Sequence, residues 1–404
     1  MKCMICSSEK LHKFLSLGNH PPSDRFLNQS QLKEPEPKYP LEVFFCEDCK
    51  LVQLGFAVPP EILFTDSFVY TTGSSGELVK NFSSLVEKLT EKFSLSSEDF
   101  VIDIGSNDGT LLSYYPEEIK VLGIDPSEAS KLAVQRGIPT LRKFFDEKTA
   151  EEVSKQQGKA KIITATNVFA HVKELDSFMK GIKKLLTENG VFIEESHYLA
   201  DMVSRMEYDS IYLEHLRYYS LKPLIRLFEL YNMTVFDAEK ISTHGGSLRV
   251  YACRKDAYEI SENVSKILEE EEKAGLYEKK TFDNFAEKIF ETKQKLQNIL
   301  LKIKKEGKKI VGIGAPAKGN TLLNYCKIDN TILEYLAEHG SLKVGKFSPG
   351  MHLKVVEESQ VFEDQPEYAL LLAWNLKNII VPKLKEKGFK GKFVIPNPEP
   401  CILE

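Results

Sequence analysis

Short apolar runs alternate with amphipathic stretches through the middle of the chain. The runs at 101–105 (VIDIG), 121–124 (VLGI), 161–165 (KIITA) and 190–194 (GVFIE) each fit a buried strand, and 175–186 has the spacing of an amphipathic helix. Strands that alternate with helices in this way are typical of a doubly wound parallel sheet. We therefore predict an α/β fold with a central Rossmann-like sheet.

A second set of strands follows a long charged stretch at 256–305, which has the pattern of one or two long helices. Apolar runs at 309–313, 370–375 and 393–396 predict further strands, and a turn after the first of them begins a helix that runs to Tyr325. The carboxyl-terminal part is therefore expected to form a second Rossmann-like α/β domain.

Polar residues and glycines follow the strands of the predicted central sheet. The turn after the first strand lacks the G-x-G-x-x-G pattern, so a dinucleotide fits poorly, and 110–115 is expected to be helical. Asp103 instead suits a ligand with an amino acid group and a sulfonium, and Asp125 can accept hydrogen bonds from a ribose diol. We predict S-adenosylmethionine as cofactor, bound by these residues: Asp103, Gly105, Asn107, Asp108, Gly109, Asp125 and Asn167.

Four of the seven cysteines form two C-x-x-C pairs near the amino terminus: Cys3, Cys6, Cys46 and Cys49. Two such pairs predict a closed four-sulfur zinc site, which is structural because no coordination position stays open for substrate. The prolines between the pairs predict an irregular excursion from Leu11 to Pro40. The remaining cysteines are expected to be packed thiols: Cys253, Cys326 and Cys401.

Composition excludes several classes of protein. The chain of 404 residues carries a net charge of -5, which argues against nucleic acid as the main partner, because phosphate recognition needs a basic surface. It has no apolar run of about eighteen residues and no signal-peptide profile. We therefore expect a cytoplasmic protein with no membrane partner and more than one domain.

The densest polar chemistry lies in the segment 208–219, which packs tyrosines, a glutamate and a histidine together. If this segment is helical, Tyr212 and His215 share a face because they are three residues apart. A histidine beside a tyrosine and near a cofactor is a candidate general base, whereas an ordinary polar helix is the alternative. The paired glycines in 242–252 (STHGGSLRVYA) indicate a close backbone approach to a ligand or to a neighbouring strand.

The start of the helix predicted after Gly314 is a candidate phosphate site, because backbone N–H groups at a helix start attract phosphate. Lys318, Asn320 and Thr321 would complete a clamp for a diphosphate or a sugar. A Rossmann-like lid without ligand contacts is the alternative.

Seven motifs follow one another along the chain: CEDCKLVQL, YTTGSSG, DIGSNDGTLL, NVFAHV, YLEHLRYYS, THGGSLRVY and GAPAKGNTLLNY. In this order they resemble the zinc-containing sugar C-methyltransferases over nearly the whole chain. The resemblance implies methylation of a nucleotide-linked deoxy-keto-sugar by a three-domain enzyme, and self-contained three-domain relatives favour a monomer. We expect a zinc-binding domain at 1–68, a methyltransferase domain at 69–255, a helical linker at 256–305 and a nucleotide-sugar-binding domain at 306–404.

The resemblance also assigns catalytic roles. It implies that His215 is the base, that Tyr212 positions or polarises the sugar, and that Glu214 orients a sugar hydroxyl or the base. His171 would lie beside the cofactor, and Tyr70 over the active site.

The resemblance extends to the substrate, and it has two departures. The residues expected at the substrate are the following: His244, Ser247, Arg249, Lys318, Asn320, Thr321 and Ser348. Leu213 stands where many members have a histidine, which we expect to affect packing or substrate preference and not the chemistry. Lys50 replaces a common glycine after the last zinc cysteine and is expected to affect only the shape of the metal knuckle.

The chemistry of C-methylation sets the requirements of the site. Carbon becomes nucleophilic when a proton is removed beside a carbonyl group, so His215 would take the proton from C3 of a 4-keto sugar. Tyrosine hydroxyls would stabilise the enolate oxygen, and the enolate would attack the aligned methyl group. The alternatives are an O- or N-methyltransferase, an RNA methyltransferase, and a non-catalytic sugar-nucleotide binding protein. The nucleotide, the sugar and the methylated carbon stay open.

Overall fold

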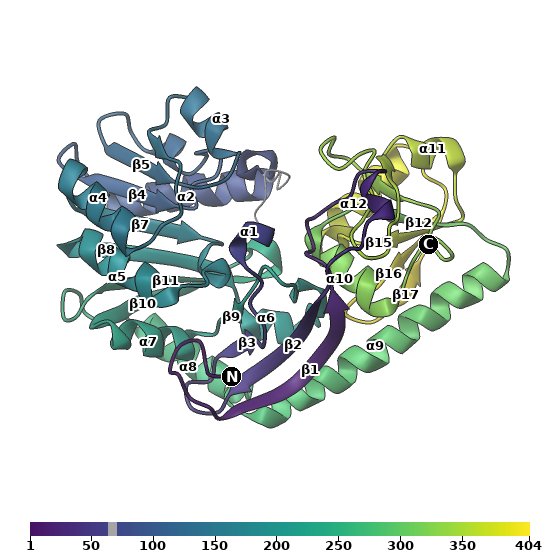
Figure 1. The fold of residues 1–404 in the computed structure, drawn as a ribbon, viewed down its shortest axis with the longest axis horizontal. Coiled ribbons are helices and arrows are strands. Elements are labelled where there is room, and N and C mark those ends of the chain that lie inside the picture. The colour runs from purple at the N-terminus through teal and green to yellow at the C-terminus, as the bar shows by residue number, and fades with distance from the viewer. Residues whose placement is uncertain (64–70) are drawn as a thin grey trace.

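The computed structural model describes residues 1–63 and 71–404, which form two lobes joined along one side (Figure 1). The first lobe contains the central sheet, and the second contains the carboxyl-terminal sheet. The amino-terminal sheet and one long helix run between them. The described residues therefore contain three sheets.

The amino-terminal sheet is antiparallel, with the strand order β1-β2-β3-β9. Its strands are β1 (Leu11–His20), β2 (Tyr39–Cys46), β3 (Val52–Leu54) and β9 (Arg217–Tyr218). The irregular excursion predicted between the cysteine pairs is thus wrong over β1. Leu15 and Leu17 are buried on one face of this strand, and the prolines at 21–22 follow it without interrupting it.

The central sheet has the order β10-β11-β8-β7-β4-β5-β6 and is parallel from β6 to β8. Its strands are β4 (Phe100–Ile104), β5 (Lys120–Ile124), β6 (Thr140–Leu141), β7 (Ala160–Thr166), β8 (Leu186–His197), β10 (Met233–Ile241) and β11 (Ser247–Arg254). This confirms the predicted doubly wound sheet. The strand order reverses between β4 and β7, where ligands of such sheets bind. The helix predicted at 110–115 is only a short 3-10 turn, Leu112–Tyr114.

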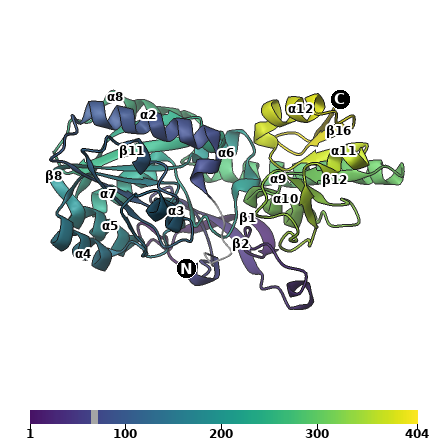
Figure 2. The ribbon, with the colours of Figure 1, turned by 90° about the horizontal axis from the view of Figure 1, so that it is seen from above.

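Helices cover both faces of the central sheet (Figure 2). One face packs against α2 (Gly76–Lys92). The other face packs against α4 (Glu147–Gln157), α5 (Leu175–Leu185), α7 (Leu221–Leu230) and α8 (Glu262–Lys273). Three short helices also belong to this part of the chain: α1 (Pro60–Leu63), which precedes α2, and α3 (Ser130–Gln135) and α6 (Leu199–Ser204).

The carboxyl-terminal sheet has the order β14-β13-β12-β15-β16-β17, with only β17 antiparallel. Its strands are β12 (Ile310–Ile313), β13 (Leu336–Glu338), β14 (Val355–Glu357), β15 (Tyr368–Leu371), β16 (Lys392–Ile395) and β17 (Cys401–Leu403). Its helices are α10 (Ala317–Cys326), α11 (Gln360–Asp364) and α12 (Lys377–Glu386). The order reverses between β12 and β15, which confirms a second Rossmann-like sheet.

The amino-terminal domain contacts both lobes. The helix α9 (Lys279–Lys305) runs along β1, and Phe282 packs its ring 5.1 Å from that of Phe14 (Figure 1). The loop between β1 and β2 reaches the carboxyl-terminal lobe, where Leu27 bridges to Phe347. Within the described residues, no helix is long and apolar enough to cross a membrane.

Candidate active site

The four amino-terminal cysteines form one metal-binding cluster. The Sγ atoms of Cys3 and Cys49 lie 3.4 Å apart, those of Cys6 and Cys46 lie 3.6 Å apart, and all four lie within 4.8 Å of one another. A zinc tetrahedron with Zn–S bonds of about 2.3 Å has edges of roughly 3.8 Å. The cluster therefore has the ligand type and the spacing of a closed zinc site.

The residues around the cluster refine two expectations. Lys50 adopts a left-handed conformation with φ of 69°, which is the conformation that the common glycine would favour. Its Nζ atom donates to the carbonyl of Glu47, which closes the knuckle. The expectation of three packed thiols holds for Cys253 and Cys326, whereas Cys401 is exposed because it lies on the edge strand β17.

The cofactor residues predicted from the sequence meet at the carboxyl edge of β4, β5 and β7. Gly105 and Asn167 both have positive φ, and a Cβ atom on Gly105 would lie 2.2 Å from the side chain of Val168. The carboxylate of Asp125 accepts hydrogen bonds from the backbone N–H of Asn107 at 2.9 Å and that of Ser127 at 2.7 Å. These contacts fold two strand ends tightly around the point where the strand order reverses.

The turn after β4 also holds the segment that precedes α2. The side chain of Asn107 accepts a hydrogen bond from the N–H of Thr72, and that of Asp108 accepts one from Gly73. Gly109 has a φ of 76° and packs against α3. Tyr70 lies outside the described residues.

The electrostatics of this edge suit a cationic ligand. Burial, together with the charges of Asp125 and Glu195, raises the pKa of Asp103 to about 7, and Thr164 opposes this rise by donating a hydrogen bond at 2.6 Å. Neighbouring acids of this kind are stabilised by positive charge. The ammonium and sulfonium groups of S-adenosylmethionine carry that charge, so the donor set fits this cofactor.

His215 and Tyr212 face each other as the sequence predicted, but on a turn and not on a helix. The N–H of His215 donates to the carbonyl of Tyr212, and the following strand β9 draws the chain into the amino-terminal sheet. The two rings lie with their centroids 4.0 Å apart and their planes tilted by 33°, and the Tyr212 hydroxyl lies 2.9 Å from His215 Nε2.

The hydrogen bonds of His215 define its tautomer. Its Nδ1 lies 3.3 Å from the carbonyl oxygen of Ser210, which can only accept, so Nδ1 carries the proton. Nε2 then carries no proton, and its lone pair accepts a hydrogen bond from the Tyr212 hydroxyl. Burial and the neighbouring histidines lower the pKa of His215 well below 6.5, so the imidazole is neutral at physiological pH.

Three more histidines surround this ring. His171 lies 4.8 Å from His215 between ring centroids and donates through Nδ1 to the carbonyl of Glu214. His197, at the end of β8, lies 6.1 Å from both His215 and His244. The sequence analysis missed His197, although its place just after a predicted strand was a signal that could have revealed it.

Glu214 points away from this cluster. Its carboxylate accepts hydrogen bonds from Ser23, at 2.8 Å from the N–H and 2.9 Å from the hydroxyl. Burial raises the pKa of Glu214 to about 7, and the charge of Asp24 adds to this. Glu214 thus fastens the loop after β1 to the segment that carries His215.

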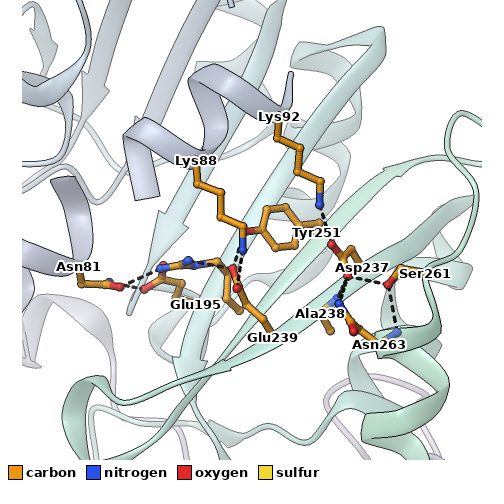
Figure 3. A network of polar contacts seen from close by, with 11 residues as sticks. Asn81, Lys88, Lys92, Glu195, Asp237, Ala238, Glu239, Tyr251, Ser261 and Asn263 are labelled. Atoms are coloured by element: carbon orange, nitrogen blue, oxygen red, sulfur yellow. Dashed lines mark hydrogen bonds and ion pairs between the residues drawn. The ribbon is translucent and has the colours of Figure 1, made fainter. Parts of the chain in front are cut away.

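Arg249 is fully committed inside the central lobe. Its Nε lies 2.5 Å from the Glu195 carboxylate, and its other nitrogens donate to Glu239 at 2.9 Å and Asn81 at 2.8 Å (Figure 3). Glu239 also accepts from Lys88 on α2. This network pins α2 to β8, β10 and β11, which differs from the substrate contact that the resemblance implied.

The other residues expected at the substrate lie in two places. Asn320 and Thr321 on α10 donate to the carbonyls of Ser23 and Ile211, and they line a small pocket with Tyr212. Lys318, in the first turn of α10, lies 5.4 Å from the Trp374 ring.

Ser247 and Ser348 are engaged locally. Ser247 donates to the carbonyl of Thr243 at 3.0 Å, and Ser348 accepts from the N–H of Leu353 at 3.0 Å. Both side chains are fully buried, so they stabilise the loops that carry them.

Comparisons with known proteins match the three parts of the chain in order. Residues 3–64 match a family model for a zinc binding domain, residues 78–238 a methyltransferase domain, and residues 242–398 a C-methyltransferase C-terminal domain. The C-methyltransferase NovU of Streptomyces niveus is 29% identical over 408 residues, which cover 100% of this chain and 96% of the relative. The chain is therefore similar to the zinc-containing C-methyltransferases over nearly its whole length. It is therefore a methyltransferase that uses S-adenosylmethionine and binds zinc through its four amino-terminal cysteines.

Solved structures match this C-methyltransferase over less than half of its length. An S-adenosylmethionine-dependent methyltransferase of Clostridium acetobutylicum is 14% identical, with a TM-score of 0.35, over 44% of this chain and 92% of that one. Magnesium protoporphyrin IX methyltransferase of Synechocystis is 16% identical, with a TM-score of 0.34, over 44% of this chain and 83% of that one.

Proposed function

We propose that this C-methyltransferase acts on a 4-keto deoxysugar linked to a nucleoside diphosphate and methylates C3. The observation that carries the proposal is the neutral Nε2 atom of His215, which the Tyr212 hydroxyl contacts at 2.9 Å. A neutral imidazole whose Nε2 atom carries no proton is a base that can take a proton from the carbon beside a ketone.

The cofactor would lie on the acidic edge of the central sheet. Asp103 would meet its cationic groups and Asp125 its ribose, with the turn from Gly105 to Gly109 and Asn167 shaping the backbone around it. S-adenosylmethionine supplies an electrophilic methyl group on sulfur.

The hydrogen bond between Tyr212 and His215 gives the two residues linked roles. When His215 Nε2 takes the C3 proton, it can no longer accept from the Tyr212 hydroxyl. That hydroxyl can then donate to the ketone oxygen as negative charge develops there, which is where stabilisation is most effective. Burial makes the protonated imidazole costly, and the adjacent enolate charge offsets part of that cost.

The nucleotide would reach this site from the carboxyl-terminal lobe. Lys318 and the start of α10 would hold the diphosphate, and Asn320 and Thr321 of the same helix line a small pocket with Tyr212. The substrate would therefore span from the second sheet to the histidines of the first.

Turnover with defined substrates tests the proposal. The full-length zinc-loaded enzyme is incubated with S-adenosylmethionine and with CDP-, GDP-, UDP- and dTDP-linked 4-keto-6-deoxyhexoses. We expect one of them to gain a methyl group on C3, identified by mass spectrometry and NMR of the intact product. A methyl group on oxygen or nitrogen would contradict carbon chemistry.

A second measurement isolates the base. Without cofactor in deuterium oxide, the enzyme should exchange the C3 proton of its substrate, and His215→Asn should abolish that exchange. Exchange that persists in this variant would remove His215 from the role.

A further inference from the structure

The region between His215 and the carboxyl-terminal lobe contains an unusual pair of neutral histidines, His197 and His244. The Nε2 atom of His197 lies 2.6 Å from the carbonyl oxygen of His244, which can only accept. His197 is therefore the Nε2–H tautomer, and its Nδ1 atom has a lone pair. That atom is buried and has no hydrogen-bond partner among the described residues.

The loop that accepts the hydrogen bond of His197 has a tightly fixed backbone. His244 has a φ of 57°, which is uncommon for a residue other than glycine, and Gly245 and Gly246 follow it with φ of 89° and 129°. A Cβ atom on Gly246 would lie 2.2 Å from the Asp201 carboxylate, and one on Gly245 would lie 2.6 Å from that of Glu207. The packing of this loop therefore sets the position of the His244 carbonyl, to which His197 donates.

In this orientation His197 presents a buried acceptor that has no partner among the described residues. Such an acceptor is destabilising, and a ligand that donates a hydrogen bond to it removes this cost. The ring of His197 lies 6.1 Å from that of His215, so one sugar ring can contact both.

We propose that His197 is a specificity-determining residue whose Nδ1 atom accepts a hydrogen bond from the C2 hydroxyl of the sugar. The inference rests on the proposed function, in which His215 faces C3. The carbon on one side of C3 carries the ketone oxygen, which can only accept and so cannot satisfy His197 Nδ1. The carbon on the other side is C2, whose hydroxyl can donate. The proposal assigns this hydroxyl to His197 Nδ1, so the enzyme requires a 2-hydroxy and not a 2-deoxy substrate.

A matched pair of variants separates the two hydrogen bonds of His197. His197→Asn places an amide oxygen near the position of Nδ1 and keeps an acceptor for the substrate. His197→Gln places an amide nitrogen near the position of Nε2 and keeps the bond to the His244 carbonyl, but it loses the acceptor.

The experiment compares kcat/KM for the active 4-keto-6-deoxyglucose nucleotide of the panel and for its 2-deoxy counterpart. We expect the wild type to prefer the 2-hydroxy substrate by at least about 100-fold, because a site built to bind a hydroxyl rejects an analogue that lacks it. His197→Asn should keep most of this preference, whereas His197→Gln should lose it. Equal turnover of both substrates by the wild type, or full preference in His197→Gln, overturns the inference.

Imidazole ¹⁵N NMR of the full-length enzyme supplies a readout that does not depend on turnover. We expect His197 to be the Nε2–H tautomer and its Nδ1 resonance to shift when the 2-hydroxy substrate binds. An Nδ1–H tautomer would overturn the inference even if the enzyme methylates C3. A panel without any product contradicts the proposed function instead, so the two failures are distinguishable.

Discussion

Two polar networks start from the same face of β8 and end differently. Glu195 enters a network with Arg249, Glu239 and Asn81 in which the charged groups contact one another (Figure 3). His197, two residues further along, donates to a carbonyl and keeps an unpartnered acceptor. A closed network fixes the fold, whereas an open one leaves capacity for a ligand.

This difference divides a motif that reads as one unit in the sequence. The stretch THGGSLRVY carries His244, Ser247 and Arg249, which the resemblance grouped as substrate contacts. The structure places His244 in the open network and Arg249 in the closed one, and Ser247 bonds to its own loop. Ser247 and Arg249 are alternate residues of one strand and therefore share a face. Their partners lie on other segments, so the sequence alone could not tell which of these side chains contacts protein and which contacts a ligand.

The largest expected effect is on kcat, and it comes from His215, which lies beside the open network of His197. His215→Asn should lower kcat by about 10²–10⁴-fold, because it removes the general base and keeps a donor near the position of Nδ1. Steady-state kinetics check the rate, and calorimetry should show unchanged binding of S-adenosylmethionine. A tenfold or smaller loss of kcat would place the base elsewhere.

The closed network should respond in stability and not in rate. Arg249→Ala leaves the buried Glu195 carboxylate without its cation in a site that is 4% exposed at the arginine, whereas Glu239 keeps its pair with Lys88; the loss should cost about 3–5 kcal/mol of unfolding free energy. Urea unfolding measures this loss. The double variant Arg249→Ala with Glu195→Gln should recover part of it, since less uncompensated charge stays buried. A raised KM for the sugar with unchanged stability would restore the substrate role of Arg249.

Much of the fold could be predicted because apolar periodicity is local. The runs at 121–124 and 161–165 became β5 and β7 nearly residue for residue, and the charged stretch at 256–305 became α8 and α9. The strand β1 was not predicted because the prolines of the loop that follows it indicated irregular structure for the whole segment. The short β9 could not be predicted, since its pairing with β3 depends on residues far away in sequence.

The position of a candidate site residue was predictable where it lies at a strand end, as at Asp103 and Asp125. The role of a residue was not predictable where burial or a distant partner decides it. Burial moves the pKa of His215 well below the value of about 6.5 that the sequence analysis assumed. Glu214, adjacent to the base, contacts Ser23 from the amino-terminal domain, and no local pattern reveals that contact.

The acidic edge of the central sheet supplies a smaller, pH-dependent effect. The pKa of Asp103 is about 7, above its ordinary value of 3.8, so the free enzyme holds this carboxyl protonated below pH 7. A cationic cofactor favours the ionised form, so binding below pH 7 releases a proton. Affinity for S-adenosylmethionine should therefore rise by up to about tenfold per pH unit from pH 5 to 7 and level off above. Calorimetry in buffers of different ionisation enthalpy checks this, and Asp103→Asn should remove the slope.

The smallest effect decides to which network Glu214 belongs. Ser23→Ala deletes the hydroxyl that donates to Glu214 at 2.9 Å and keeps the backbone donor at 2.8 Å. If Glu214 belongs to a closed network that fastens the amino-terminal loop, the variant should lose about 1 kcal/mol of unfolding free energy and keep its kcat. If Glu214 instead orients the base, kcat should fall while the stability holds, because the freed carboxylate would turn toward His215. Parallel urea unfolding and steady-state kinetics on this single variant distinguish the two roles.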